Sequence, residues 1–444
     1  LGAKVEVLEA RHSFSRLQVL HLWEWVESDL VELGIKLIDP SIFTASDLRR
    51  CSTSQLQHSL LKVSLLLGVS VSFGCRVDSV GYLCARRVDV LVDASGARCE
   101  QLDSLGFSQT VALRSARALC IVISLYNRKT TEELELREST WSQQYYQHDF
   151  SALQQEGVVL ENLVYYRSTG AFSDAATHYF VLTTTAEALE AYGALIRGVA
   201  EQAAAGQPLC HPSNTVPDRV EAYARRAVAA FVPSLATEEM VPGQLSLFDF
   251  SERKQSNRAA VAVPGTGLGG RQDSVCLVTR VGDALQEPFW PEGLGINRGF
   301  LGVLDCADLV QRATPLLLTP LGQPPATVPS FEPLIARREE LYALTKRLSG
   351  TNRLTELKPH LDGSRRLKYA IDPATRYAAW RGANEHERAA SSTRPTAPSR
   401  PRMAFHASPR NSTPAQAEPI RAKVSVKDID GLLSNAASLL QNAK

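Results

Sequence analysis

The chain has 444 residues, of which 44% are hydrophobic and 21% are charged, a composition typical of a globular protein with two or three domains. Its 48 Lys and Arg residues balance its 47 Asp and Glu residues, and no local basic patch stands out, so no nucleic-acid partner is expected. No apolar run approaches the roughly 20 residues that cross a bilayer, so no membrane-spanning helix is expected.

Eight cysteines are scattered along the chain, and no two of them are separated by only two residues. This spacing disfavours metal knuckles and thioredoxin-like pairs. Because no secretory signal is present, we interpret the cysteines as buried thiols of a cytoplasmic protein. The first residue is Leu rather than Met, and we therefore expect the chain to be part of a longer protein.

The N-terminal part alternates between strand and helix patterns. Residues 3–9 form a β-branched run, and helical periodicity follows at residues 20–33. A stronger amphipathic helix is predicted over residues 55–67, and residues 69–73 alternate as a strand. Residues 88–94 form a nearly continuous apolar run, which is typical of a buried strand in a parallel sheet. This alternation predicts an α/β fold.

The middle of the chain is richer in strands. Three β-rich segments are predicted at residues 118–126, 163–166 and 178–185. Helical patterns then occupy residues 186–205 and 218–231. A strand is predicted near residues 274–280 and a helix over residues 331–349.

The composition changes after about residue 380. Ser, Thr, Pro, Ala and Arg predominate there, and the segment has too few apolar residues to form a core, so we predict a disordered tail. Two interpretations remain open for residues 426–443: a short amphipathic helix that docks on a protein partner, or an unstructured terminus.

The most informative stretch is VGDALQEPFWPEGLGINRGFL, residues 281–301. Asp283 follows a predicted strand and can accept hydrogen bonds from the hydroxyls of a sugar-like chain. Apolar residues from Phe300 onward restart a helix, whose N-terminal amides favour negative charge. Three glycines between them allow the backbone to approach a flat or anionic ligand closely: Gly293, Gly295 and Gly299. The alternative interpretation is a glycine-rich surface loop that binds no ligand.

This order of strand, acid, glycine turn and helix resembles the second flavin-binding motif of aromatic-hydroxylase-type flavoproteins. In that group the acid binds the ribityl chain of FAD, which implies this role for Asp283. Glu9 ends the first predicted strand, where a dinucleotide fold has the acid that binds the adenosine ribose. The glycine fingerprint that should precede Glu9 is expected upstream of Leu1. Residues 265–270, GTGLGG, are interpreted as a turn between strands, because a strand pattern follows them instead of a helix.

Further blocks resemble the MICAL family of F-actin monooxygenases. They recur in order along the chain, at residues 9–23, 55–57, 60–63, 160–166, 177–183, 287–291 and 372–377. The resemblance implies an α/β fold with a discontinuous Rossmann-like FAD-binding domain and an inserted β-rich monooxygenase domain. The expected layout assigns residues 1–117 and 241–330 to the FAD-binding domain, 118–240 to the insertion, 331–380 to a helical segment and 381–444 to the tail.

By that resemblance, Glu9, Arg11 and Arg16 would contact the adenosine and pyrophosphate side of FAD. Gln18 stands where the family usually has Asn at the flavin, and Val77 stands where a relative uses the backbone of a Phe. The remaining cofactor contacts implied at the second motif are Asp283, Gly293, Gly295 and Asn297.

Tyr179 would face the isoalloxazine ring, and Trp290 would act beside the flavin as a mobile aromatic gate; core packing is the alternative for both. Residues 88–98 correspond to a motif that FAD and NADPH binding share, with Ser95 in place of the usual Asp. The segment at residues 170–176 lengthens a loop before Tyr179, and no calponin-homology or LIM pattern follows residue 380.

The implied activity uses NADPH to reduce FAD, after which the reduced flavin activates oxygen. In the family the target is methionine in F-actin, which becomes the sulfoxide. The histidines show no metal-ligand spacing, and His21 and His178 are expected to form structural hydrogen bonds. Two rival hypotheses remain: a flavin hydroxylase of a small aromatic substrate, and a non-catalytic actin-binding or scaffold protein.

Overall fold

The computed structural model describes residues 3–35, 49–77, 79, 83, 88–97, 100–114, 118–168, 175–264, 275–288, 295–317 and 330–347. These residues all belong to one compact unit, Leu1–Asn384. The predicted tail and the candidate helix at residues 426–443 lie outside the described residues.

Two groups of short strands form the α/β part. Strand β1 (Glu6–Glu9) pairs in parallel with β4 (Ser70–Phe73). Strand β14 (Val275–Arg280) pairs in parallel with β5 (Val90–Asp93) and antiparallel with β13 (Ala260–Pro264). The strands predicted at residues 69–73, 88–94 and 274–280 are therefore confirmed, as is the parallel pairing expected for residues 88–94.

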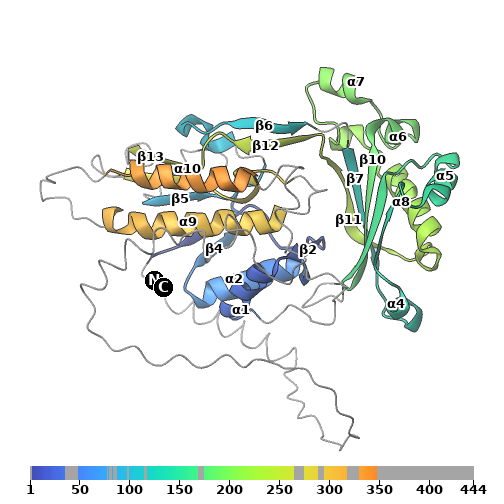
Figure 1. Cartoon of the computed structure of the whole chain (residues 1–444), viewed down its shortest axis with the longest axis horizontal. Coiled ribbons are helices and arrows are strands. Elements are labelled where there is room, and N and C mark those ends of the chain that lie inside the picture. The colour runs from blue at the N-terminus through green and yellow to red at the C-terminus, as the bar shows by residue number, and fades with distance from the viewer. Residues whose placement is uncertain are drawn as a thin grey trace, which may run out of the picture. The chain divides into compact units, whose positions relative to one another are not determined.

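Two long helices, α9 and α10, pack on the three-stranded sheet (Figure 1). Their bounds are Gly295–Leu317 for α9 and Glu332–Arg347 for α10. Ala260 and Leu277 of the sheet pack against Leu309 and Ala313 of α9. Helix α10 adds the apolar side chains of Leu334 and Ile335 to this cluster. Helix α9 begins five residues before Phe300, so that Gly295 and Asn297 lie in its first turn.

The segment expected to be a helix over residues 20–33 is divided. Val19–Leu22 forms strand β2, which pairs with β3 (Arg49–Ser52), and helix α1 begins only at Glu24 and ends at Glu32. The strand partner lies far along the sequence, so local periodicity could not reveal it. Helix α2 (Thr53–Leu66) confirms the amphipathic prediction, and Ser52 and Gln55 close a capping box at its start.

The middle of the chain folds as a five-stranded antiparallel sheet with strand order β11-β7-β10-β9-β8. Their bounds are Ala118–Tyr126 for β7, Ser139–Ser142 for β8, Asn162–Ser168 for β9, Thr177–Thr185 for β10 and Met240–Asp249 for β11. The three predicted β-rich segments are confirmed, and β11 extends the sheet past residue 240, where the insertion was expected to end.

Alternation along these strands gives the sheet two apolar faces. One face, which includes Ile121 and Phe180, packs under helices α5 (Gln147–Gln155) and α8 (Pro217–Phe231) (Figure 1). The other face, which includes Cys120 and Tyr179, packs against Val19 of β2. The second face therefore lies against the loop that follows Glu9.

Shorter elements complete the described part of the chain. The helix expected over residues 186–205 is two helices, α6 (Ala186–Ala191) and α7 (Val199–Ala204), with Gly193 and Gly198 between them. Strand β12 (Glu252–Ser256) pairs with β6 (Gln109–Arg114). The remaining elements are α4 (Thr131–Glu135) and four 3₁₀ turns, η2 (Glu100–Leu105), η3 (Pro212–Asn214), η4 (Pro233–Leu235) and η6 (Gly282–Ala284).

No helix among the described residues combines the length and apolarity that crossing a membrane would require. The six cysteines in the described part of the chain are free thiols. Burial raises the pKa of the Cys51 and Cys276 thiols to about 12, so both are protonated and unreactive at neutral pH.

Candidate functional site

Glu9 lies at the carboxyl end of β1 and turns the chain that follows. Its Oε1 accepts a hydrogen bond from the backbone N–H of Arg11 at 2.8 Å, and the Arg11 guanidinium lies 3.6 Å from the same oxygen. Both side chains remain in contact with solvent, at 22% exposure for Glu9 and 47% for Arg11. The strand thus presents a carboxylate and a guanidinium together at its end.

The loop after Arg11 is held from two sides. The first amides of α2 donate to it, from Ser54 to the Arg16 carbonyl at 2.8 Å and from Thr53 to the Gln18 carbonyl at 2.9 Å. The side chain of Gln244, on β11, donates to the Ser15 carbonyl at 3.0 Å. The backbone of the loop is therefore fixed, while the Arg16 side chain is exposed.

Arg16 joins the two strand-end acids electrostatically. Desolvation and the positive charge of Arg11 lower the pKa of Arg16, whereas the carboxylates of Asp283 and Glu9 raise it. Both acids therefore act electrostatically on one guanidinium, although they come from opposite ends of the sequence. Arg16 is exposed, and within the described residues its side chain makes no hydrogen bond.

Asp283 lies in η6, directly after β14. Its side chain is exposed, yet the protein crowds it enough that desolvation raises the pKa of the carboxyl group. The positive charges of Arg298 and Arg16 lower that pKa only in part. Among the described residues no hydrogen bond to this carboxylate is formed, and its partners there are the two positive charges.

Asn297 connects α9 to the end of β2 and to the residue that follows it. Its Oδ1 accepts from the Trp23 N–H at 2.9 Å, and its Nδ2 donates to the His21 carbonyl at 3.0 Å. The fully buried amide thus acts on the protein backbone, which makes it a positioning group in this arrangement. Gly295 is also packed closely, because a Cβ there would meet the Pro288 ring at 2.8 Å.

Three other predicted residues lie near this region in different environments. Tyr179 is 1% exposed in the cluster that includes Val19 and Cys120, and within the described residues its hydroxyl has no partner. The buried Oε1 of Gln18 likewise has none among the described residues. Val77 packs its side chain against the apolar cluster around Val278.

Several expectations fall outside the described residues. They concern Trp290, Gly293, most of the loop at residues 170–176 and the glycine turn at residues 265–270.

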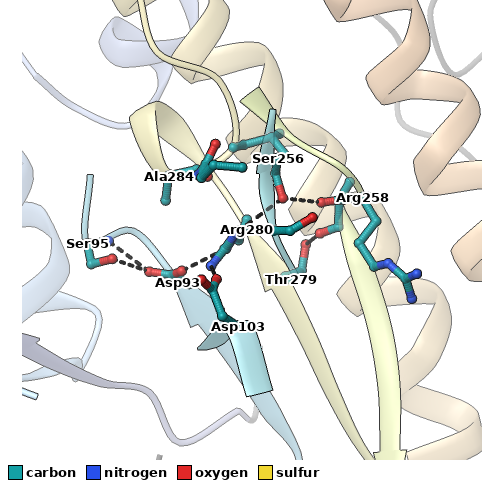
Figure 2. A network of polar contacts seen from close by, with 12 residues as sticks. Asp93, Ser95, Asp103, Ser256, Arg258, Thr279, Arg280 and Ala284 are labelled. Atoms are coloured by element: carbon teal, nitrogen blue, oxygen red, sulfur yellow. Dashed lines mark hydrogen bonds and ion pairs between the residues drawn. The ribbon is translucent and has the colours of Figure 1, made fainter. Parts of the chain in front are cut away.

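The sequence reasoning missed a buried ion-pair network at the carboxyl ends of β14 and β5 (Figure 2). Arg280, fully buried at the end of β14, donates to Asp93 at the end of β5 at 3.1 Å and to Asp103 at 3.3 Å. Ser95 donates through its hydroxyl to the same Asp93 at 2.6 Å. The clue was in the sequence, since a charged residue ends each of these two apolar strands, and buried charges are paired.

His178 forms a structural network, as expected. Its Nε2 lies 3.2 Å from Glu133 Oε1, and its Nδ1 lies 2.8 Å from the Tyr165 hydroxyl. Burial lowers the pKa of His178 more than Glu133 raises it, so the ring is neutral at pH 7. A neutral ring donates from Nε2 and accepts at Nδ1, which satisfies both contacts.

No group of three or more His, Cys, Asp or Glu side chains within the described ranges could hold a metal ion. The site instead combines two carboxylates, of Glu9 and Asp283, with the guanidiniums of Arg11, Arg16 and Arg298. Such a set suits an organic ligand with hydroxyls and an anionic centre.

Comparison with known proteins identifies relatives over most of the chain. A family model described as Mical, Rossman domain, matches residues 117–259. The [F-actin]-monooxygenase mical1 of Danio rerio is 33% identical over 402 residues, which are 85% of this chain and 30% of that protein. The Mus musculus protein MICAL1 is 31% identical over 407 residues, or 85% of this chain and 34% of that protein. The chain thus spans about a third of the length of these relatives.

The matched family segment coincides with the antiparallel sheet β7–β11 and with β12, while the parallel strands lie outside it. Among solved structures, a ternary complex of aklavinone-11 hydroxylase with FAD and aklavinone is similar, with a TM-score of 0.46 and 14% identity over 83% of this chain and 68% of that chain.

Proposed function

We propose that this chain, which belongs to the MICAL family, is the FAD-dependent monooxygenase part of a protein that oxidises methionine in F-actin. The observation that carries the proposal is the placement of an acid at the end of each of two parallel strands, Glu9 at the end of β1 and Asp283 directly after β14, with the Arg11 guanidinium 3.6 Å from Glu9. The charges of both acids also raise the pKa of Arg16. Two strand-end acids with guanidiniums beside them suit the two sugar-like ends and the anionic centre of a dinucleotide.

Each group has a distinct role in holding FAD. Glu9 accepts hydrogen bonds from the adenosine ribose, while Arg11 and Arg16 neutralise the diphosphate as a pair. Asp283 accepts hydrogen bonds from the ribityl hydroxyls. These bonds stabilise the ionised carboxylate and so lower its pKa. Gly295 lets the start of α9 pack closely against Pro288, and Asn297 fixes that helix to the end of β2 and to Trp23.

The bound flavin would take a hydride from NADPH and activate oxygen, and the protein would bind, orient and shield it. Tyr179 supports the site from the face of the antiparallel sheet, with an apolar surface around it that excludes water. The FAD-binding domain would be discontinuous, formed by the segment before β7 and the segment from β12 onward. The protein would act in the cytoplasm, at the actin cytoskeleton.

The proposed binding of FAD is tested by titrating the full chain with FAD. Asp283→Asn and Glu9→Gln should each weaken FAD binding by about ten- to hundredfold, because each removes a charge-assisted acceptor. Glu156→Gln is the matched control, since that carboxylate pairs with Arg226 in the antiparallel region. Equal affinity in all four proteins would remove the support for the site.

The substrate arm is tested by NADPH oxidation with and without F-actin, followed by mass spectrometry of actin methionines. Faster NADPH consumption with F-actin, together with methionine sulfoxide, is the expected result. Stimulation by small phenols alone would favour an aromatic hydroxylase. A chain that binds F-actin but neither FAD nor NADPH would be a scaffold protein.

A further inference from the structure

The loop that carries Asp283 is bonded to the rest of the protein through its backbone. The Ala284 carbonyl accepts from the Gln109 side chain at 3.0 Å. The Leu285 carbonyl accepts twice at 2.8 Å, from the Ser256 N–H and from the Tyr342 hydroxyl. The Asp283 carboxylate takes no part in these hydrogen bonds. They fix the backbone of the loop and leave the Asp283 side chain outside the network.

Two side chains that hold this loop and the strand end before it come from α10, a helix that follows the second flavin-binding motif in the sequence. Tyr342 is fully buried, and its hydroxyl also lies 2.9 Å from the Ser256 carbonyl. Arg338, 1% exposed, donates to the Arg280 carbonyl at 3.2 Å and to the Gly302 carbonyl at 3.4 Å. These contacts bind α10 to the strand end before Asp283, to the loop after it and to α9.

The same helix is anchored away from the loop as well. Glu339 accepts from the Ala259 N–H at 2.6 Å, and Arg338 pairs with the fully buried Asp305 at 3.5 Å. Below the loop, the Arg280–Asp93 pair joins the ends of the two neighbouring parallel strands (Figure 2). Such buried charges and hydroxyls are costly to leave without partners, so the loop has one strongly favoured position.

We propose that α10 is a positioning element of the cofactor site, in which Tyr342 holds the backbone of the Asp283 loop for ligand binding. The inference rests on the proposed function, because the ligand of Asp283 is taken to be the ribityl chain. The hydroxyl of Tyr342 bonds the backbone carbonyls of Ser256 and Leu285 and, among the described residues, not the Asp283 side chain. It acts by keeping the Leu285 carbonyl, and with it the 3₁₀ turn, in the conformation that presents the carboxylate.

The test compares Tyr342→Phe with Tyr223→Phe in the full chain. Tyr223 is an equally buried tyrosine whose hydroxyl bonds a backbone carbonyl, that of Val159 at 2.5 Å, but in the antiparallel region. Both variants lose one hydroxyl and keep the ring. They therefore separate a general loss of stability from a change at the Asp283 loop.

Two readouts are measured for each variant beside urea unfolding. In the protein without FAD, hydrogen–deuterium exchange of residues 282–286 should become about three- to tenfold faster in Tyr342→Phe and remain unchanged in Tyr223→Phe. The FAD dissociation constant should rise by a similar factor of about three to ten in Tyr342→Phe only.

Unchanged exchange at residues 282–286 in Tyr342→Phe would overturn the positioning role, as would equal changes in the two variants. If a chain extended upstream through the expected glycine fingerprint binds no FAD, the proposed function fails. The exchange measurement still decides whether α10 holds the loop.

Discussion

Replacing Asn297 with alanine isolates the contact that joins α9 to the chain after β2. The buried amide accepts from the Trp23 N–H at 2.9 Å and donates to the His21 carbonyl at 3.0 Å. In the alanine variant each of these backbone groups loses its hydrogen bond to the Asn297 side chain. An unpaired buried backbone group costs about 1–3 kcal/mol, and both groups are only partly buried, so we expect the unfolding free energy to fall by about 2–4 kcal/mol.

Urea unfolding measures this loss, and Asn214→Ala is the matched control. Asn214 is also buried, and its amide bonds the backbone of Arg197 and Leu209 in the antiparallel region. Both variants should lose stability, but only Asn297→Ala should accelerate hydrogen exchange at residues 19–25 and weaken FAD binding. A loss below about 0.5 kcal/mol would refute the reasoning, because a change that small is ordinary for surface positions. So would equal exchange at residues 19–25 in both variants.

Three further predictions concern packing and pH. Gly295→Ala should lower the unfolding free energy by about 1–3 kcal/mol, because its Cβ would meet Pro288 at 2.8 Å. On the same helix a Cβ at Gly299 would meet no atom within 4 Å, so Gly299→Ala should raise the unfolding free energy by about 0.5–1 kcal/mol. Equal effects of the two substitutions in urea unfolding would contradict the close packing of Gly295 on Pro288. Burial lowers the pKa of His178 below its ordinary value of 6.5, so the unfolded chain binds this proton more readily. The unfolding free energy should therefore decrease as the pH falls through 6.5, and His178→Gln should lose that part of the pH dependence in urea titrations at several pH values. Burial raises the pKa of Asp283 above 3.8, so in the absence of FAD its ionisation opposes folding, and stability falls as the pH rises through the raised pKa. Asp283→Asn should remove this slope and stabilise the protein without FAD while weakening FAD binding; a less stable variant at pH 7 would argue against a desolvated carboxylate.

The sequence by itself determined the α/β class, the family and the identity of the two strand-end acids. These features are local: an apolar run that ends in an acid, an amphipathic stretch such as residues 55–67, and a glycine-rich turn before a helix. Each is set by side-chain periodicity or backbone freedom over a few residues, so a single chain read in order reveals it. A role for Glu9 and a role for Asp283 are each suggested by their own segment, and both roles stay predictions.

Only the tertiary structure decided how these segments meet. Residues 20–22 have helical periodicity, yet β2 forms because β3, beyond α1, offers it a hydrogen-bonding edge. The amide of Asn297 is directed to the chain after β2, and α10 reaches the Asp283 loop through Tyr342, although neither contact has a sequence signal. Long-range pairing and the burial of charges such as Arg280 depend on distances between segments, which the order of residues does not contain.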